Sequence, residues 1–202
     1  MNIYTHFQNL KLTEDQNNAL VSLNKFFVGD DKVFILQGYA GSGKTTLIKG
    51  IISYLKEIGK TFEVMAPTGR AAKILRDKTG CGQTIHKSIY NYKELQTLEN
   101  NDCEDDKSFR YIFPIRENQN DGSIIIVDEA SMISAVESTN EVFSFGTEIV
   151  LNDLLTYSRI PFSKNKIIFV GDPAQLPPVG DSNSKALIKE YFEELGIKTS
   201  LS

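Results

Sequence analysis

Short apolar runs alternate along the chain with longer segments whose apolar residues recur at helical spacing. The apolar runs predict four buried strands, at Val33–Leu36, Phe62–Ala66, Ile124–Val127 and Ile167–Val170. The helical spacing predicts helices at Thr13–Phe27, Thr45–Ile58, Arg70–Lys78, Thr147–Ser158 and Ser184–Leu195. Strands that alternate with helices are typical of parallel βαβ units. We therefore predict an α/β fold, in which a mainly parallel β-sheet carries helices on both faces.

Several predicted helices have recognisable ends. Thr13 and Gln16 form the T-x-x-Q pattern of a capping box, so the first helix is expected to begin at Thr13. Gly59 and Gly80 follow the second and third helices, where glycine readily ends a helix. Beyond Leu195 the chain has only a few polar residues, which leaves four strands in the predicted sheet.

Two stretches, residues 91–122 and 135–146, follow no regular period. Within the first, Glu99–Asp106 is acidic and has no apolar period, which predicts a solvated loop. Phe109–Phe113 is compatible with a short strand. These stretches are the least defined parts of the predicted fold.

Composition limits the class of protein without identifying it. The 202 residues suit one well-packed domain, with 41% hydrophobic and 24% charged residues. The net charge of −4 means that a nucleic-acid partner needs a local basic patch. Cys81 and Cys103 are too few for a disulfide scaffold or a zinc cluster. No apolar run approaches the ~18 residues of a membrane span, and the N-terminus lacks a secretory signal, so a cytoplasmic location is expected.

The segment Gly38–Thr46, GYAGSGKTT, carries the clearest chemical signal. It fits the phosphate-loop (P-loop) pattern G-x-x-x-x-G-K-[ST] and lies between a predicted strand and a predicted helix. Its glycines let backbone N–H groups turn toward an anion, and the helix adds its positive end. Lys44 is expected to reach the β- and γ-phosphates and the Thr45 hydroxyl to bind Mg²⁺. The predicted nucleotide site comprises Gly38, Ala40, Gly41, Ser42, Gly43, Lys44, Thr45 and Thr46.

An acidic pair follows the third predicted strand. Asp128 is expected to hold Mg²⁺, usually through water, as in a Walker B motif. Glu129 is expected to orient and deprotonate the attacking water. The alternative is an acidic pair that only begins a helix, where the dipole favours negative charge; the P-loop upstream favours the metal site.

The fourth predicted strand runs into a loop rich in glycine and proline, Gly171–Gly180. Polar groups in such a loop lie at the carboxyl edge of a parallel sheet, where ligands bind. Gln175 can donate and accept hydrogen bonds, so it suits a sensor of the γ-phosphate. A surface glutamine in a rigid turn is an equally good interpretation of the spacing.

Five segments resemble, in order, motifs I, Ia, Ic, II and III of superfamily 1 DNA helicases. They are GYAGSGKTT, APTGRAAKIL, TIHKSIY, IIIVDEASM and VGDPAQLPPVG. Motifs Ia and II resemble the RecD/Dda-like 5′→3′ branch more than the UvrD/Rep-like branch. The resemblance extends from Leu12 to Gly180. It implies a RecA-like P-loop NTPase fold, ATP and Mg²⁺ as cofactors, and single-stranded DNA as partner.

The resemblance also implies roles for residues that periodicity does not assign. Gln16 matches the glutamine that contacts the adenine edge, although the capping box also explains it. Gln175 in motif III would couple the state of the γ-phosphate to the grip on DNA. The residues that match the DNA-facing motifs Ia and Ic are Pro67, Thr68, Gly69, Arg70, Thr84 and His86. A solvated helix face for Arg70 and a packed side chain for His86 are the alternatives.

Superfamily 1 helicases close their ATP site between two RecA-like domains, and motifs IV to VI of the second are not found in this sequence. Residues 1–202 are therefore expected to form a single RecA-like ATPase domain, as a fragment that binds nucleotide but does not unwind DNA. In these helicases the second domain supplies arginines that stabilise the charge of the transition state. No arginine of this sequence clearly matches them, and Arg159 is the alternative considered for that role. Two other functions also use a P-loop: a different P-loop enzyme such as a small-molecule kinase, and a non-enzymatic, nucleotide-dependent binding module.

Overall fold

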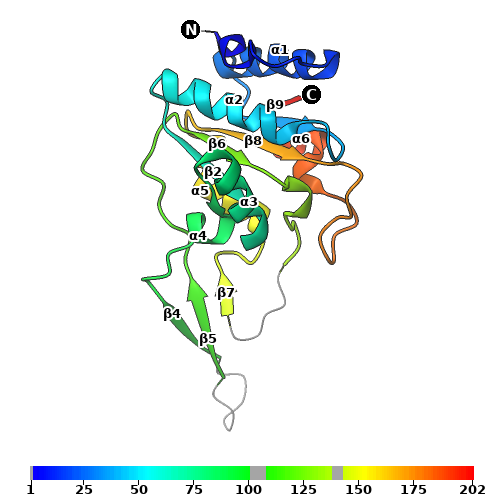
Figure 1. Cartoon of the computed structure of the whole chain (residues 1–202). Coiled ribbons are helices and arrows are strands. Elements are labelled where there is room, and N and C mark those ends of the chain that lie inside the picture. Colours follow the sequence, from blue (N-terminus) through cyan, green and yellow to red (C-terminus); the bar gives the residue numbers. More distant parts are fainter. Residues whose placement is uncertain (1, 101–107, 138–142) are drawn as a thin grey trace.

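A six-stranded parallel sheet forms the centre of the molecule (Figure 1). The computed structural model describes residues 2–100, 108–137 and 143–202. The strand order is β3-β2-β6-β8-β1-β9, and every neighbouring pair is parallel. The strands are β1 (Val33–Gln37), β2 (Phe62–Ala66), β3 (Gln83–Thr84), β6 (Ile124–Val127), β8 (Lys166–Gly171) and β9 (Thr199–Leu201). The predicted α/β class is confirmed.

Helices cover both faces of this sheet. They are α1 (Glu14–Val28), α2 (Lys44–Glu57), α3 (Gly69–Thr79), α4 (Ile85–Ile89), α5 (Val150–Tyr157) and α6 (Lys189–Glu194). One buried cluster joins α1, α2 and α3 to alternate strand residues such as Phe34 and Leu36. The other cluster joins α4, α5 and α6 to the intervening residues, including Val33 and Ile35. The central strands are apolar at every position because both of their faces are covered.

The helix ends follow local hydrogen bonding. The Thr13 side chain and the Gln16 side chain form the predicted capping box of α1. Gly80 has the left-handed backbone that ends α3, with a φ of 78°. The helix predicted from Thr147 begins only at Val150, because the Thr147 N–H and hydroxyl donate to the carboxylate of Asp153 instead.

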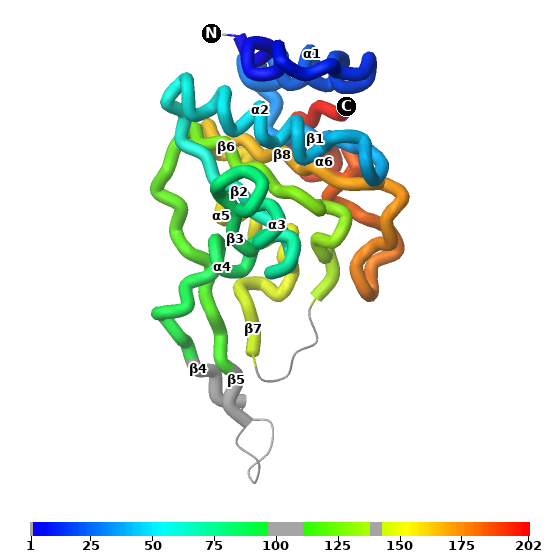
Figure 2. Tube along the Cα trace, in the orientation of Figure 1, coloured from blue at the N-terminus to red at the C-terminus, as the bar shows by residue number. Residues whose placement is uncertain are grey.

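The prediction for the carboxyl-terminal segment was wrong in two respects. The expected helix Ser184–Leu195 is broken into a short 3₁₀ helix, η3 (Lys185–Leu187), and α6, with extended backbone at Ile188 between them. The polar residues after it form β9, which pairs with β1 at the edge of the sheet (Figure 2). Since β9 and the two-residue β3 lack an apolar run, the predicted four strands became six.

A second, three-stranded sheet projects from the domain (Figure 1). It contains β4 (Gln96–Asn100), β5 (Ser108–Phe113) and β7 (Phe143–Phe145). The short strand expected at Phe109–Phe113 is therefore present, and the segment predicted as irregular at 135–146 contains β7. The predicted loop Glu99–Asp106 begins inside β4, and its remainder from residue 101 lies outside the described residues.

Two properties bear on the sequence predictions. Cys81 is a half-buried free thiol, whereas Cys103 lies outside the described residues. Among the residues that the structure describes, no helix has the length and apolar character needed to cross a membrane.

The amino-terminal 3₁₀ helix η1 (Ile3–Phe7) packs against α2. Ile3 and Phe7 are buried, and the Phe7 ring lies over Gly50 in the middle of α2. A Cβ at Gly50 would lie 1.9 Å from Phe7 Cζ. The ring therefore occupies the volume that any larger residue at position 50 needs.

Candidate nucleotide-binding site

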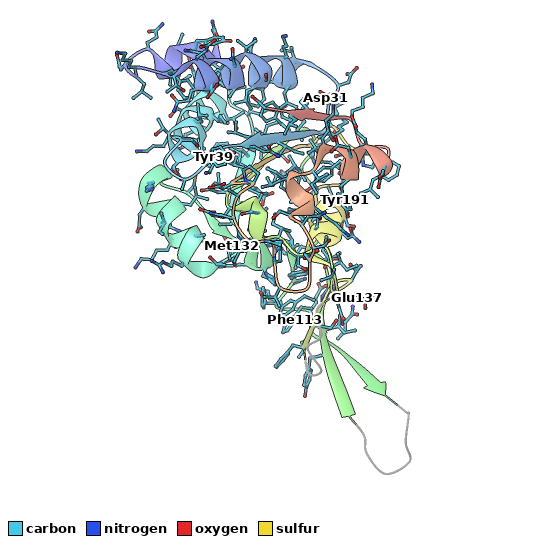
Figure 3. The ribbon with its side chains drawn as sticks, turned by 90° about the vertical axis from the view of Figure 1, so that its right-hand side faces the viewer. Asp31, Tyr39, Phe113, Met132, Glu137 and Tyr191 are labelled. Carbon is cyan, nitrogen blue, oxygen red and sulfur yellow. The ribbon has the colours of Figure 1, made fainter. Side chains whose placement is uncertain are left out.

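The sequence motifs meet at one edge of the large sheet. Because all six strands are parallel, the loops that follow them leave from the same carboxyl edge. In spatial order from β1, this edge carries the P-loop, the Gly171–Gly180 loop, the Asp128–Glu129 pair, motif Ia and motif Ic. The strand β8 lies between β1 and β6, so the P-loop and the acidic pair flank Gly171–Gly180 at about 5 Å per strand. Figure 3 shows the two ends of the strands. Tyr39 of the P-loop and Met132, which follows the acidic pair, lie toward the left of the molecule, whereas Asp31, which precedes β1, lies toward its right.

Two glycines of the P-loop lie close to the side chains of Ser42 and Gln16. A Cβ at Gly38 would lie 2.5 Å from Ser42 Oγ, across the loop. Gly43 has a φ of 89° and is the N-cap of α2, and a Cβ there would lie 2.5 Å from Gln16 Nε2. The Ser42 N–H donates to the Tyr39 carbonyl at 3.1 Å, so the backbone turns within the loop as the pattern predicted, and α2 begins directly after it.

Lys44 lies folded over the loop. Its Nζ donates to the carbonyl oxygens of Gly38 at 2.6 Å and Tyr39 at 3.0 Å. Both acceptors are neutral carbonyls, so an anionic oxygen would form a stronger, charge-assisted hydrogen bond with this ammonium group. Thr45 follows as the second residue of α2.

Gln16 links the start of α1 to the P-loop. Its Oε1 accepts from the Thr13 N–H at 3.0 Å, and its Nε2 donates to the Ser42 carbonyl at 2.9 Å. A cleft of about 560 Å³ opens beside this contact, between α1 and the loop. Its wall includes Thr13, Asp15, Gln16, Gly38, Lys44 and Ser202. Gln16 therefore joins the start of α1 to the P-loop at the wall of this cleft.

The acidic pair has an unusual environment and backbone. Burial raises the pKa of Asp128, and the neighbouring Glu129 charge adds to the rise, whereas a hydrogen bond from the Glu129 N–H and the attraction of Lys44 oppose it. Glu129 has a φ of 53°, in the left-handed region that few residues other than glycine adopt. Backbone strain of this kind persists where the surrounding contacts fix a side chain in place.

Gln175 connects the Gly171–Gly180 loop to the acidic pair. Its Nε2 donates to Glu129 Oε2 at 3.2 Å, and its Oε1 accepts from Ser131 Oγ at 2.5 Å. A carboxylate accepts hydrogen bonds only, so it requires the Nε2 side of the amide, and the Ser131 hydroxyl holds the opposite side. From the sequence, Gln175 could be interpreted either as a sensor of the γ-phosphate or as a surface residue. In the structure its side chain contacts Glu129.

The sequence motifs contained Ser131 but gave it no role. Ser131 is fully buried, and Ser184 Oγ donates to its carbonyl at 3.0 Å. A small polar residue two positions after the acidic pair was the one available signal. That signal did not identify its partner, because Gln175 is 44 residues further along the chain.

The residues predicted to face DNA begin two helices at the same edge. The hydroxyls of Thr68 and Thr84 cap α3 and α4, accepting from backbone N–H groups at 3.2 Å each. Arg70 is exposed in the first turn of α3. His86 packs edge-on against Phe145, with 5.3 Å between ring centroids, and burial lowers its pKa. A neutral imidazole at this place offers a polar contact but no positive charge.

Arg159 lies at the other edge of the sheet. It precedes β8, whereas the P-loop follows the parallel strand β1. Five paired residues at about 3.3 Å each separate the two edges by ~16 Å. The suggestion that Arg159 replaces an arginine from a second domain was therefore wrong for this P-loop.

The fold and this edge define a P-loop nucleotide-binding α/β domain. A family profile described as "AAA domain" matches residues 11–195, and the chain belongs to this family. It is similar to the RecBCD enzyme subunit RecD of Buchnera aphidicola, with 31% identity over 176 residues, and to the ATP-dependent DNA helicase dda of Enterobacteria phage T4, with 31% over 183 residues. The predicted resemblance to RecD/Dda-like helicases is confirmed.

The similar region makes up most of this chain but a smaller part of each relative. The matches cover 81% and 90% of this chain but 26% and 36% of RecD and dda, respectively. A crystal structure of Pif1 helicase from Candida albicans matches with a TM-score of 0.47 and 18% identity, over 95% of this chain and 40% of that one. The chain thus spans about a quarter to a third of the length of the curated relatives named here.

Proposed function

We propose that this chain is the ATP-binding motor domain of a DNA helicase, in which ATP hydrolysis drives 5′→3′ movement along single-stranded DNA. The observation that carries the proposal is the hydrogen-bonded chain from Glu129 through Gln175 to Ser131. It links the proposed general base to a loop at the edge where the DNA-facing motifs also lie. The printed name of one relative, ATP-dependent DNA helicase dda, supports an ATP-driven helicase role.

The nucleotide would lie along the P-loop with its base toward Gln16. The loop residues Gly38 to Thr46 would surround the phosphates with backbone N–H groups, as loops of this pattern do. Lys44 would move from the carbonyls of the loop to the β- and γ-phosphates. Thr45 and Asp128 would hold Mg²⁺, because a hard cation prefers hydroxyl and carboxylate oxygens.

Glu129 would act as the general base on the attacking water, and Gln175 would respond to the γ-phosphate. When the phosphate leaves, Gln175 returns to the contact with Glu129 that the structure contains. Its loop would then shift against motifs Ia and Ic, where Pro67, Thr68, Gly69, Arg70, Thr84 and His86 are proposed to lie along the DNA. Backbone N–H groups at the start of α3 suit phosphate contacts.

A second RecA-like domain of the same parent protein would close the site. In NTPases of this kind an added arginine raises the rate by ~10³–10⁵-fold. Residues 1–202 alone are therefore expected to bind nucleotide, to hydrolyse it slowly, and not to unwind duplex DNA.

The test measures nucleotide binding and DNA binding as linked equilibria. A fluorescent ATP analogue with Mg²⁺ is titrated with and without a single-stranded oligonucleotide, and the oligonucleotide is titrated with and without the analogue. Both affinities are expected to change by the same factor, since coupling between two sites is reciprocal. Lys44→Ala is the control and is expected to lose nucleotide binding. A P-loop kinase predicts no mutual effect, and that result would contradict the proposal. A non-enzymatic, nucleotide-dependent binding module predicts the mutual effect without ATP hydrolysis, so hydrolysis is measured in parallel.

Replacing Ser131 by alanine tests the hydrogen-bonded chain directly. Loss of one hydrogen bond to Gln175 is expected to slow ATP hydrolysis by about 3- to 10-fold, because the amide is no longer held toward Glu129. Nucleotide affinity is expected to stay close to that of the wild type. Ser184→Ala is the matched control, since its hydroxyl binds the Ser131 carbonyl and does not reach Gln175. Equal rates for the two variants would remove Ser131 from the mechanism.

A further inference from the structure

The Gly171–Gly180 loop is fixed where it leaves the sheet. Its first carbonyl accepts from the Gly38 N–H of the P-loop at 3.0 Å. Asp172 then closes a tight turn, because its Oδ1 accepts from the Ala174 N–H at 2.9 Å and its carbonyl accepts from the Gln175 N–H at 3.2 Å. These contacts fix the backbone of Gln175 from the side that precedes it.

The part of the loop after Gln175 has few contacts. The side chains of Leu176 and Val179 are 87% and 100% exposed. Within the described part of the chain, residues 176–180 form no hydrogen bond with any residue other than Asp181, whose N–H donates to a carbonyl of the loop at 3.0 Å. The next fixed point after Gln175 is therefore Asp181.

Asp181 binds the end of the loop to the segment that follows the acidic pair. Its Oδ2 accepts from Ser134 Oγ at 3.0 Å and from the Ala135 N–H at 3.2 Å. The Ser134 carbonyl in turn accepts from the Leu151 N–H at 3.1 Å, so α5 supports this segment. A carboxylate accepts stronger hydrogen bonds than a neutral oxygen does, which makes Asp181 a firm end point for the loop.

The segment that Asp181 contacts is continuous with the acidic pair. A 3₁₀ helix, η2 (Ala130–Met132), connects Glu129 to Ser134. The last N–H of η2 donates to the Glu129 carbonyl at 3.1 Å, so this connection is compact. Two polar links therefore join the loop to the chain that carries Glu129. Gln175 makes the first link and Asp181 makes the second.

The second carboxylate oxygen of Asp181 has no partner. Oδ1 is buried, and within the described residues no group donates to it. A buried polar atom without a partner lowers the stability of the folded state. The carboxylate is thus costly to bury, and what offsets this cost is the pair of hydrogen bonds that Oδ2 accepts from the segment after Glu129.

We infer that Asp181 is a positioning residue for ATP hydrolysis. By fixing the far end of the loop, it restricts Gln175 to positions from which Nε2 reaches Glu129. Asp181 lies outside the five helicase-like segments, the last of which ends at Gly180. It acts in this way only if Glu129 and Gln175 have the roles proposed above, on which the inference rests.

A double-mutant cycle tests whether Asp181 acts through Gln175. Asp181→Ala, Gln175→Ala and the double variant are compared with the wild type by single-turnover ATP hydrolysis, and binding of a fluorescent ATP analogue is measured in parallel. Asp181→Ala alone is expected to slow hydrolysis by about 3- to 10-fold, because two hydrogen bonds are lost, with nucleotide affinity within about 2-fold of wild type. In the Gln175→Ala background the same substitution is expected to have almost no further effect.

Two more variants separate positioning from a general loss of structure. Asp181→Asn keeps an oxygen that can accept from Ser134 and Ala135, so it is expected to retain most of the rate. Asn183→Ala is the matched control, because Asn183 is exposed and its side chain forms no hydrogen bond in the described part of the chain. Equal slowing by Asp181→Ala in the wild-type and Gln175→Ala backgrounds would overturn the inference.

The position of Gln175 is also measured without nucleotide, from the side-chain amide NMR signals of ¹⁵N-labelled protein. The order parameter of Gln175 Nε2 is expected to fall in Asp181→Ala and to stay at the wild-type value in Asn183→Ala. An unchanged order parameter in Asp181→Ala overturns the positioning by Asp181. A wild-type hydrolysis rate in Gln175→Ala instead removes Gln175 from the proposed mechanism, and the role of Asp181 with it, so the two failures appear in different measurements.

Discussion

Glu129→Gln is expected to lower the rate of ATP hydrolysis by about 10²–10⁴-fold while nucleotide affinity changes little. Glutamine keeps the size of glutamate but does not accept the proton of the attacking water. The proposed phosphate and metal contacts come from Lys44, Thr45 and Asp128, which the substitution leaves in place. The measurement is single-turnover hydrolysis of radiolabelled ATP, with equilibrium binding of a fluorescent analogue measured in parallel.

Two further variants separate the role of Glu129 from a general loss of structure. Lys44→Ala is expected to lose nucleotide binding, so the two variants differ in binding although both lose hydrolysis. Asp128→Asn is expected to need more Mg²⁺ for nucleotide binding, because a neutral amide replaces a ligand. A Glu129→Gln variant that hydrolyses ATP at the wild-type rate would exclude Glu129 as the general base.

Gly50→Ala is expected to destabilise the domain by about 0.5–2 kcal/mol, although alanine is the better helix former. The new Cβ would lie 1.9 Å from Phe7 Cζ, so the Phe7 ring must leave its place. Losing the burial of one phenylalanine costs about 1.5–3 kcal/mol. The replacement of glycine by alanine within a helix returns about 1 kcal/mol. Urea unfolding followed by circular dichroism measures the difference.

The double variant with Phe7→Ala provides the internal check. Once the ring is absent, the methyl group at position 50 has free space. Gly50→Ala is then expected to stabilise the protein by about 1 kcal/mol, so its effect changes sign. A destabilising effect of the same size in both backgrounds would show that η1 does not pack on α2 through Phe7.

The sequence predicted the parts of the fold that have a strong local pattern. Ile124–Val127 is apolar throughout because both faces of β6 are covered, and its predicted bounds agree with the structure. The capping box at Thr13 is likewise a contact between residues three positions apart. The P-loop was recognisable because its chemistry needs specific residues at fixed spacing.

The remaining features depend on contacts between distant residues. The edge strand β9 contains Thr199 and Ser200, and its position is set by pairing with β1 instead of by its own pattern. The bond between Ser131 and Gln175 joins loops after two different strands. The expected single helix before β9 is interrupted at Ile188, where the preceding Leu187 carbonyl accepts from Gln37 Nε2. None of these partners is visible in a local window of sequence.

The position of β1 in the sheet has a consequence for synthesis of the protein. The strand that leads into the P-loop is made before both of its neighbours, β8 and β9, which come from residues after 165. A ribosome adds about 5–20 residues each second, so β1 waits for several seconds as an unpaired apolar segment. During that interval Val33–Leu36 has no partner strand, and it is a suitable target for a chaperone that binds short apolar stretches.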